Sequence, residues 1–263
     1  MSAADRTQTI RVIEMRGVAV GAMRDLNTTV IEDIDWVVAP GDFWVVGGVQ
    51  GSGKSDFLLL AGGLMAPAAG VYYFMGEEMP IFEEERLRER LRLGLVFDGG
   101  QLFNHLTVSE NIGLPIRYHE NLNTAAADAD VKRMLELTEL SPWADSTPGA
   151  IGRNWQKRAG LARALMLKPE VLLLDNPLAG LDLRHRAWWL KLLAQLSAGH
   201  PWMDGRPMTL IVTADDLRPW QPRAKQFALI SDKRFSVLGS WAKVEAATND
   251  QVRELLAFPA HTP

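Results

Sequence analysis

One glycine-rich segment of the sequence has the residue types and spacing of a phosphate-binding loop. Residues 48–55 read Gly-Val-Gln-Gly-Ser-Gly-Lys-Ser and satisfy the pattern GxxxxGKS/T in full. Glycines allow the backbone to wrap around a phosphate chain with its N–H groups pointing inward, and a following helix N-terminus adds a favourable dipole. In such a loop Lys54 neutralises the β- and γ-phosphates and Ser55 holds Mg²⁺. The segment therefore predicts nucleotide binding by Gly48, Gln50, Gly51, Ser52, Gly53, Lys54 and Ser55.

A further acidic residue stands where a second Mg²⁺ anchor is needed. The apolar run Val171–Leu174 is typical of a buried strand, and Asp175 follows it directly. Pro177 and the sequence Gly180-Leu-Asp182 come next. A carboxylate at the end of a buried strand, downstream of a phosphate loop, favours Asp175 as a Mg²⁺ ligand beside Ser55.

Strands alternate with helices around these two motifs. A short apolar strand precedes the loop and a helix follows it, as the phosphate-loop pattern requires. Strands are expected at residues 9–20, 28–38, 43–46, 71–75, 93–97, 171–174, 209–213 and 227–230. Helices are expected at residues 54–60, 83–92, 107–116, 125–140, 154–167, 183–196 and 249–258. This alternation favours an α/β fold with a largely parallel sheet covered by helices on both faces.

The composition excludes several classes of site. The 263 residues include no cysteine, which rules out disulfides, thiolate zinc sites and cysteine nucleophiles. The five histidines show no HxxxH or HExxH spacing, so a histidine-based metal site is not expected. The net charge is −4 and the sequence shows no strong basic patch, which argues against nucleic-acid binding.

One uncharged stretch, residues 57–76, approaches the roughly 20 residues that a membrane helix needs. It contains the helix breakers Gly62, Gly63, Pro67 and Gly70, so we expect the end of a helix, a loop and a strand. The polar residues 1–9 lack the apolar core of a secretory signal. These features predict a soluble, cytoplasmic protein.

The order of the motifs resembles the ATP-binding subunits of ABC transporters, and within them the lipid-trafficking Mla type. The resemblance extends over about residues 10–258. Beyond the phosphate loop it is carried by residues 95–97, 106–111, 157–165, 172–175, 179–182 and the tail segment 232–256. A phosphate loop alone would indicate only a nucleotide-binding protein, whereas the ordered set indicates this family.

The resemblance implies a single ABC ATP-binding domain over residues 1–263, with the P-loop NTPase fold. That fold combines a mainly parallel core sheet, an antiparallel β subdomain and an α-helical subdomain, expected at about residues 102–150. A C-terminal helical tail is expected at about residues 240–263. In the family two subunits pack head to tail, as a homodimer or heterodimer, beneath a membrane permease. The resemblance therefore implies ATP and Mg²⁺ as cofactors and a position on the inner face of the cytoplasmic membrane.

The chain departs from the family pattern at the residues that perform the chemistry. Asn176 stands where the family has its catalytic Glu, and Ala214 where it has its switch His. An amide cannot accept a proton from the attacking water, and loss of a general base costs roughly 10²–10⁴-fold in rate. Asp98 replaces the Q-loop Gln and could serve as an additional Mg²⁺ ligand. Asp182, the D-loop acid, is retained.

The signature motif of the family is also altered. It corresponds to residues 151–155, where Gly152, Arg153 and Asn154 replace the serine and the two glycines. In the family this motif closes over the nucleotide of the opposite subunit. We expect Arg153 to replace part of the lost glycine N–H contact by charge.

Two further departures concern nucleotide affinity. Asp56 follows Ser55, where it would lie near the α-phosphate and repel it. The segment 17–21 offers no clear match to the aromatic residue that stacks on adenine in the family.

Three interpretations of these departures stay open. The chain could be a working ATPase with neutral variants, or a subunit that binds Mg-ATP but hydrolyses it slowly or not at all. It could also be a structural or regulatory pseudo-ATPase that docks a permease without useful ATP binding. The retained Lys54, Ser55 and Asp175 favour the second interpretation, whereas Asp56 and the missing aromatic favour the third. A soluble ABC protein without a permease is a weaker alternative.

Overall fold

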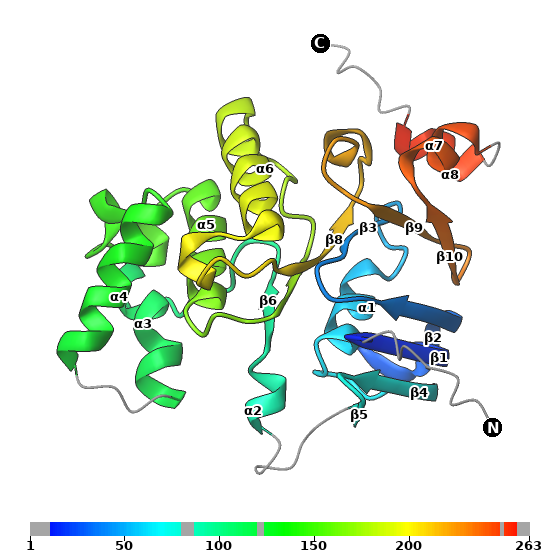
Figure 1. Ribbon diagram of the computed structural model, residues 1–263, viewed down its shortest axis with the longest axis horizontal. Coiled ribbons are helices and arrows are strands. Elements are labelled where there is room, and N and C mark those ends of the chain that lie inside the picture. The colour runs from blue at the N-terminus through cyan, green and yellow to red at the C-terminus, as the bar shows by residue number, and fades with distance from the viewer. Residues whose placement is uncertain (1–10, 80–86, 120–123, 248–249, 257–263) are drawn as a thin grey trace, which may run out of the picture.

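The computed structural model describes residues 11–79, 87–119, 124–247 and 250–256, and these form a twisted sheet flanked by helices (Figure 1). Within them, ten strands follow the spatial order β5-β4-β1-β2-β10-β9-β3-β8-β7-β6. Their bounds are β1 Ile13–Ala22, β2 Asp25–Val38, β3 Phe43–Gly47, β4 Ala69–Phe74, β5 Glu77–Met79, β6 Leu93–Val96, β7 Val171–Leu174, β8 Thr209–Ala214, β9 Gln226–Ser231 and β10 Arg234–Gly239.

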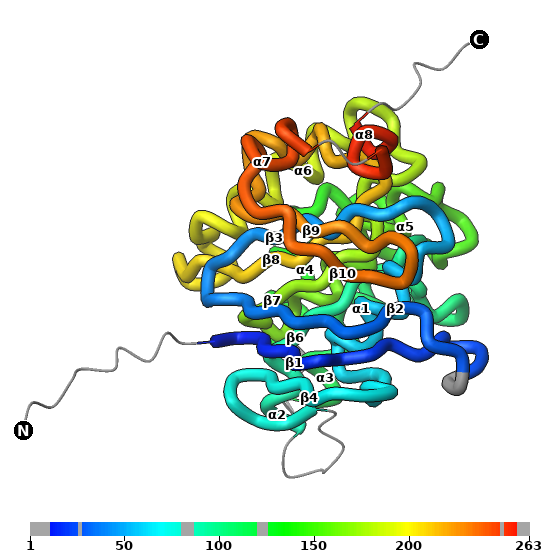
Figure 2. The backbone as a smooth tube through the Cα atoms, turned by 90° about the vertical axis from the view of Figure 1, so that its right-hand side faces the viewer, coloured from blue at the N-terminus to red at the C-terminus, as the bar shows by residue number. Residues whose placement is uncertain are grey.

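The sheet has a parallel part and an antiparallel part. Strand β3 pairs in parallel with β8 and β9, and β7 pairs in parallel with β6 and β8. Strand β1 pairs antiparallel with β2 and β4, and β4 with β5. Figure 2 shows β1 and β4 beyond β2, on the side away from β9 and β3. The expected α/β fold, with a mainly parallel core sheet and an antiparallel β region, is confirmed.

Strand β3 is buried on both faces, and this explains why its sequence is apolar throughout. Its side chains alternate between the two faces of the sheet. Phe43 and Val45 join one hydrophobic core, which also contains Trp189. Trp44 and Val46 join the other core, which contains Phe57 of the following helix. The strand that leads into the phosphate loop is therefore held from both sides.

The helices lie on both faces of the parallel strands and at one end of the molecule. Helices α3 and α4 are at the end opposite β1, β2 and β4, whereas α7 and α8 lie beside β9 and β10 (Figure 1). Helix α3 packs against α4 and α5. The bounds are α1 Lys54–Ala61, α2 Leu87–Arg90, α3 Val108–His119, α4 Thr124–Leu137, α5 Arg153–Leu165, α6 Leu183–Ala198, α7 Trp241–Ala246 and α8 Asp250–Leu256.

Most expected elements are found, with differences at their ends. Helix α4 was expected to reach Leu140 and ends at Leu137, because Glu139 adopts a left-handed φ of 57° and Leu140 N–H bonds back to Leu135 O. The helix expected at 83–92 is reduced to α2 among the described residues, since residues 80–86 lie outside them. Residues 1–10, 249 and 257–263, on which parts of other expectations fall, also lie outside the described residues.

Two short strands, β5 and β10, were not expected from the sequence, whereas the short helix α7 falls within the helical tail expected at about residues 240–263. Strand β10 forms a hairpin with β9 through Asp232 and Lys233, whose positive φ values of 47° and 61° suit a tight turn. Strand β10 alternates polar and apolar residues over Arg234–Val237 and lies partly exposed.

The uncharged stretch 57–76 forms the rest of α1, a loop and the whole of β4, as expected. Within the described ranges, no helix combines the length and apolarity needed to cross a bilayer.

Candidate functional site

The loop between β3 and α1 has the backbone of a phosphate cradle. Gly51 and Gly53 have φ values of 81° and 95°, which a side chain would strain. A Cβ atom on Gly48 would lie 2.4 Å from Ser52 Oγ, so the start of the loop has no room for a larger residue. The loop ends at Lys54, the first residue of α1, where helix N–H groups lack partners within the helix. The local sequence thus places unpaired N–H donors beside a lysine.

Lys54 is folded back onto this loop. Its ammonium group donates to Gly48 O at 2.6 Å and to Val49 O at 2.8 Å. It also forms an ion pair with Asp215, with 2.9 Å between Nζ and Oδ1. The Lys54 side chain is 7% exposed and Asp215 is 38% exposed. The lysine is therefore a nearly buried cation, and its anionic partner Asp215 is accessible to solvent.

Asp175 holds the ends of two parallel strands and the start of α1 together. Its Oδ2 accepts a hydrogen bond from Ser55 Oγ at 2.7 Å, and its Oδ1 accepts one from Thr213 Oγ1 at 2.9 Å. Asp175 follows β7 and Thr213 lies in the adjacent strand β8, so the parallel pairing sets this geometry. The hydroxyl of Ser55 and the carboxylate of Asp175 are hard oxygen ligands of the kind that Mg²⁺ prefers.

Asn176 and Asp215 are joined directly. Asn176 Nδ2 donates to Asp215 Oδ2 at 2.6 Å, and Asn176 N donates to Thr213 Oγ1 at 3.0 Å. Asn176 has a φ of 41°, a left-handed value that asparagine tolerates better than most residues. Ala214 ends β8 just before Asp215 and contributes only a buried methyl group. The positions of the expected base and switch thus hold an amide and a methyl group.

Asp98 is paired with a cation from another element. Its Oδ1 lies 2.7 Å from Nζ of Lys157, which is on α5. Lys157 is buried and also donates to Ala179 O at 2.8 Å. A role for Asp98 as a Mg²⁺ ligand therefore stays a prediction, and it requires the carboxylate to be shared with or released from Lys157.

A cavity of about 400 Å³ brings most of these residues together. Its lining consists of Gln50, Gly51, Gly53, Lys54, Ser55, Asp56, Asp98, Asp175, Asn176, Ala179 and Asp215. Nine of the residues predicted from sequence are in this set: Gln50, Gly51, Gly53, Lys54, Ser55, Asp56, Asp98, Asp175 and Asn176. Asp56 Oδ1 accepts a hydrogen bond from Met23 N at 2.8 Å, which anchors its carboxylate to the β1–β2 turn.

The comparisons with known proteins agree with this geometry. The family model described as "ABC transporter" matches residues 31–179, more than half of the chain. The chain belongs to the ABC transporter family. The members of this family include ATP-binding subunits that work as dimers with membrane permeases. The cavity fits the Mg-ATP that this family binds, since Lys54 supplies a cation, Ser55 and Asp175 supply oxygen ligands, and the loop glycines supply room.

Several curated members of the ABC transporter family are similar to the chain. The intermembrane phospholipid transport system ATP-binding protein MlaF of Escherichia coli (strain K12) is 29% identical over 247 residues, 92% of this chain and 90% of the relative. The sulfate/thiosulfate import ATP-binding protein CysA of Synechococcus elongatus is 32% identical over 220 residues, 81% of this chain and 59% of the relative.

Solved ABC structures share the fold. The dimeric ATP-binding cassette MJ0796 in a post-hydrolysis state with ADP and Pi has a TM-score of 0.75 at 23% identity, covering 87% of this chain and 100% of that chain. CbiO1 of Clostridium perfringens, part of the complex cbiONQ, has a TM-score of 0.72 at 19% identity, covering 92% and 93%.

The residues expected at the signature position, Gly152, Arg153 and Asn154, are not in the lining of the cavity. Gly152 is the N-cap of α5, and Arg153 and Asn154 begin that helix. Asn154 Nδ2 is 3.4 Å from Oδ2 of Asp182, whose Oδ1 accepts from the His185 N–H at 2.9 Å and so caps α6. This N–H lowers the pKa of the Asp182 carboxyl. Within the single chain Asn154 and Asp182 thus lie side by side, and neither of them lines the 400 Å³ cavity.

Trp155, at the last signature position, packs against a buried arginine. The Arg158 guanidinium lies 4.7 Å from the Trp155 ring centre and 3.8 Å from that of Trp188. Its Nη2 is 3.1 Å from Nδ1 of His185. Burial and the nearby Arg158 charge lower the pKa of His185. These contacts hold α5, which carries Trp155 and Arg158, against α6.

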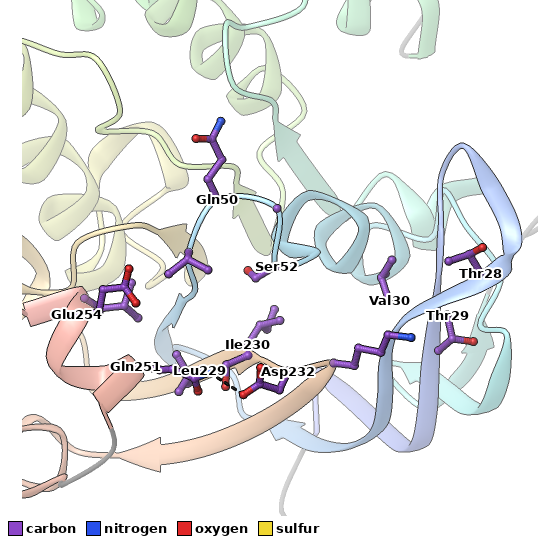
Figure 3. A pocket seen from close by; sticks show the side chains of 15 residues that line it. Thr28, Thr29, Val30, Gln50, Ser52, Leu229, Ile230, Asp232, Gln251 and Glu254 are labelled. Carbon is purple, nitrogen blue, oxygen red and sulfur yellow. Dashed lines mark hydrogen bonds between the residues drawn. The ribbon is translucent and has the colours of Figure 1, made fainter.

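A second cavity of about 360 Å³ lies on another side of the phosphate loop, between β2, β9 and α8 (Figure 3). Ser52 and Ile230 face each other across it, and Val30 borders it from β2 (Figure 3). The Ser52 hydroxyl is buried and has no hydrogen-bond partner among the described residues. Among the described residues, no aromatic side chain lines either cavity.

Sequence reasoning missed three residues of the site: Asp215, Thr213 and Lys157. Asp215 directly follows β8, as Asp175 directly follows β7, and Thr213 lies near the end of β8. Polar residues at the carboxyl ends of adjacent parallel strands were therefore a usable signal. Lys157 had no such signal, because its place on a helix gives no hint that its side chain is buried.

Proposed function

We propose that this chain is the ATP-binding subunit of a lipid-transporting ABC transporter, and that it binds Mg-ATP but hydrolyses it slowly or not at all. The observation that carries the binding is the convergence of Lys54, Ser55 and Asp175 on one cavity at the end of β3. Bound Mg-ATP would supply the free energy that favours closure of two subunits, and slow hydrolysis would make that closed state long-lived. Lipid transport is supported by the similarity to MlaF over nearly the whole of both chains.

Impaired hydrolysis is supported by the two altered catalytic positions. Asn176 presents an amide, which donates a hydrogen bond to Asp215 and cannot act as a base. Ala214 presents a buried methyl group, which offers no hydrogen bond to a phosphate. Because base and switch are replaced together, one large loss is sufficient even if the two effects do not multiply.

The test compares wild type with Asn176→Glu and Lys54→Ala, each purified with its native partners. We expect wild type to show a rise in melting temperature with Mg-ATP and, where it forms a homodimer, turnover near background. Lys54→Ala should lose the thermal shift, because the cation of the cradle is gone. Asn176→Glu should raise turnover at least about tenfold, less than a full base is worth because Ala214 is unchanged. Brisk turnover by a wild-type homodimer would contradict impaired hydrolysis.

The second candidate function is a structural or regulatory pseudo-ATPase that docks a permease. It is favoured by Asp56 on the cavity wall and by the absence of aromatic residues from both cavities within the described ranges. A melting temperature that saturating Mg-ATP does not shift would support this function over the first.

The assembly we propose is a homo- or heterodimer beneath a permease at the inner face of the cytoplasmic membrane. Beside an intact partner, one composite site would combine the partner's catalytic half with Gly152, Arg153 and Asn154 of this chain. That site keeps a base and a switch, so it is the best candidate for turnover. Arg153 would supply charge there, and an Arg153→Ala variant that closes equally well with ATP would contradict its role.

A further inference from the structure

We propose that Asp215 competes with nucleotide phosphate for Lys54 and thereby sets the affinity of the site. This inference rests on the proposed nucleotide binding at the phosphate loop. It assigns to Asp215 a role as the internal anion that a phosphate group must replace.

The first step is the hydrogen-bond capacity of Lys54. An ammonium group has three N–H donors. All three have partners at hydrogen-bond distance: Gly48 O at 2.6 Å, Val49 O at 2.8 Å and Asp215 Oδ1 at 2.9 Å. A phosphate oxygen can therefore reach Lys54 only by replacing one of these partners.

Asp215 is the partner of Lys54 that a phosphate group would replace. The two carbonyl oxygens belong to the loop itself and stay beside Lys54 whenever the loop keeps its shape. Asp215 is the only anion of the three partners, and its side chain is 38% exposed against 7% for Lys54. A phosphate group matches the charge of this carboxylate, which can swing into solvent without leaving a buried charge unpaired.

The third step explains why Asp215 stays in place. Its other oxygen, Oδ2, accepts a hydrogen bond from Asn176 Nδ2 at 2.6 Å. A carboxylate at position 176 could not donate this bond and would repel Asp215. Asn176 therefore strengthens the hold of Asp215 on Lys54, besides lacking the chemistry of a base.

The experiment compares wild type, Asp215→Asn and Asp216→Asn. Asp216 is the neighbouring residue, carries the same charge and pairs with Arg218 at 2.9 Å outside the 400 Å³ cavity. Dissociation constants for Mg-ATP and for Mg-pyrophosphate are measured by calorimetry. Pyrophosphate reports the phosphate site without requiring adenine to be held.

We expect Asp215→Asn to bind both ligands about tenfold more tightly than wild type, because a site blocked nine-tenths of the time loses about that factor in affinity. Asp216→Asn should match wild type. If all three proteins bind with equal affinity, or if Asp215→Asn binds more weakly, the competition is overturned while the proposed function stands. If Asp215→Asn binds pyrophosphate more tightly and no protein binds Mg-ATP, the competition is supported and the proposed function fails.

A readout without ligand tests the pair itself. In a double-mutant cycle, Lys54→Ala and Asp215→Ala should change the unfolding equilibrium constant non-additively, by about tenfold. The cycle of Lys54→Ala with Asp216→Ala should be additive. Additivity in the first cycle would overturn the inference, because it would show that Asp215 does not hold Lys54.

Discussion

At the scale of single residues, the site is a chain of hydrogen bonds between side chains at strand ends. Thr213 illustrates this, since its hydroxyl donates to Asp175 and accepts from the backbone N–H of Asn176. Thr213 therefore positions both Asp175, the expected Mg²⁺ ligand, and Asn176, the residue at the position of the base. His185 also has two partners. Its ring accepts a hydrogen bond from Arg158, and its backbone N–H donates one to Asp182.

The first prediction concerns the pH dependence of stability through His185. In the folded chain its pKa is lowered by burial, by Arg158 and by Arg184. Asp182 and Glu139 raise the pKa but do not cancel this effect. Below the unfolded pKa of 6.5 the unfolded chain binds a proton that the folded chain does not. Stability is thus lost as the pH falls from 6.5 towards the lower folded pKa, by no more than about 1.4 kcal/mol per pH unit.

The measurement is the free energy of unfolding in urea at several pH values between 5 and 8 for wild type and His185→Asn. The variant keeps an acceptor for Arg158 and does not titrate. Its loss of stability at acid pH should therefore be smaller than that of wild type. Some slope will be left, because burial also lowers the pKa of His200. Parallel curves for the two proteins would contradict the prediction.

At the scale of elements, the segment after β6 is positioned by a close backbone contact with α5. A Cβ on Gly160 would lie 2.6 Å from Gly100 Cα, and one on Gly100 would lie 2.3 Å from Gln156 O. Gly100 lies two residues after Asp98, whose partner Lys157 is on α5 together with Gly160. The glycine pair therefore brings the loop close enough to α5 for that ion pair to form.

We expect Gly160→Ala to destabilise the protein by about 1–3 kcal/mol, because the new methyl group meets backbone that cannot move aside. The helix propensity of alanine offsets about 1 kcal/mol of the strain at most. Gly149→Ala is the matched control, since a Cβ there meets nothing within 4 Å. If Gly160→Ala and Gly149→Ala have equal free energies of unfolding in urea, the backbone contact between Gly160 and Gly100 is not tight.

At the scale of the whole molecule, the C-terminal helix supports the strand that carries the phosphate loop. Val252 and Leu255 of α8 are buried, and a Cβ on Gly47, the last residue of β3, would lie 2.8 Å from Leu255 Cδ1. Leu255 also lines the second cavity. The tail is thus part of the structure behind the site, although it is far from the loop in sequence.

We expect Leu255→Ala to lower the free energy of unfolding by about 2–4 kcal/mol, from lost burial and the cavity left behind. Arg253→Ala is the control, because that exposed side chain makes only a 3.7 Å ion pair with Asp250. Chemical denaturation of both variants checks the difference. If Leu255→Ala is as stable as Arg253→Ala, α8 does not support β3.

The elements that the sequence predicted well are those with strong local patterns. Strand β7 was predicted to the residue because four apolar residues end at Asp175. The phosphate loop was predicted because glycine spacing and the following helix start are local features. Strand β5 was missed because three residues are too few to show a period. Strand β10 carried a short signal that was overlooked, the polar and apolar alternation of Arg234–Val237.

The sequence by itself determined the α/β alternation, the phosphate loop and the family, because each depends on residues close together in the chain. Only the tertiary structure decided the partners of the charged groups. The pairing of Lys54 with Asp215 and of Asp98 with Lys157 depends on strands and helices from distant parts of the chain meeting at one edge of the sheet. Coulomb attraction acts through space and not along the sequence, so the three-dimensional fold selects which carboxylate each lysine meets.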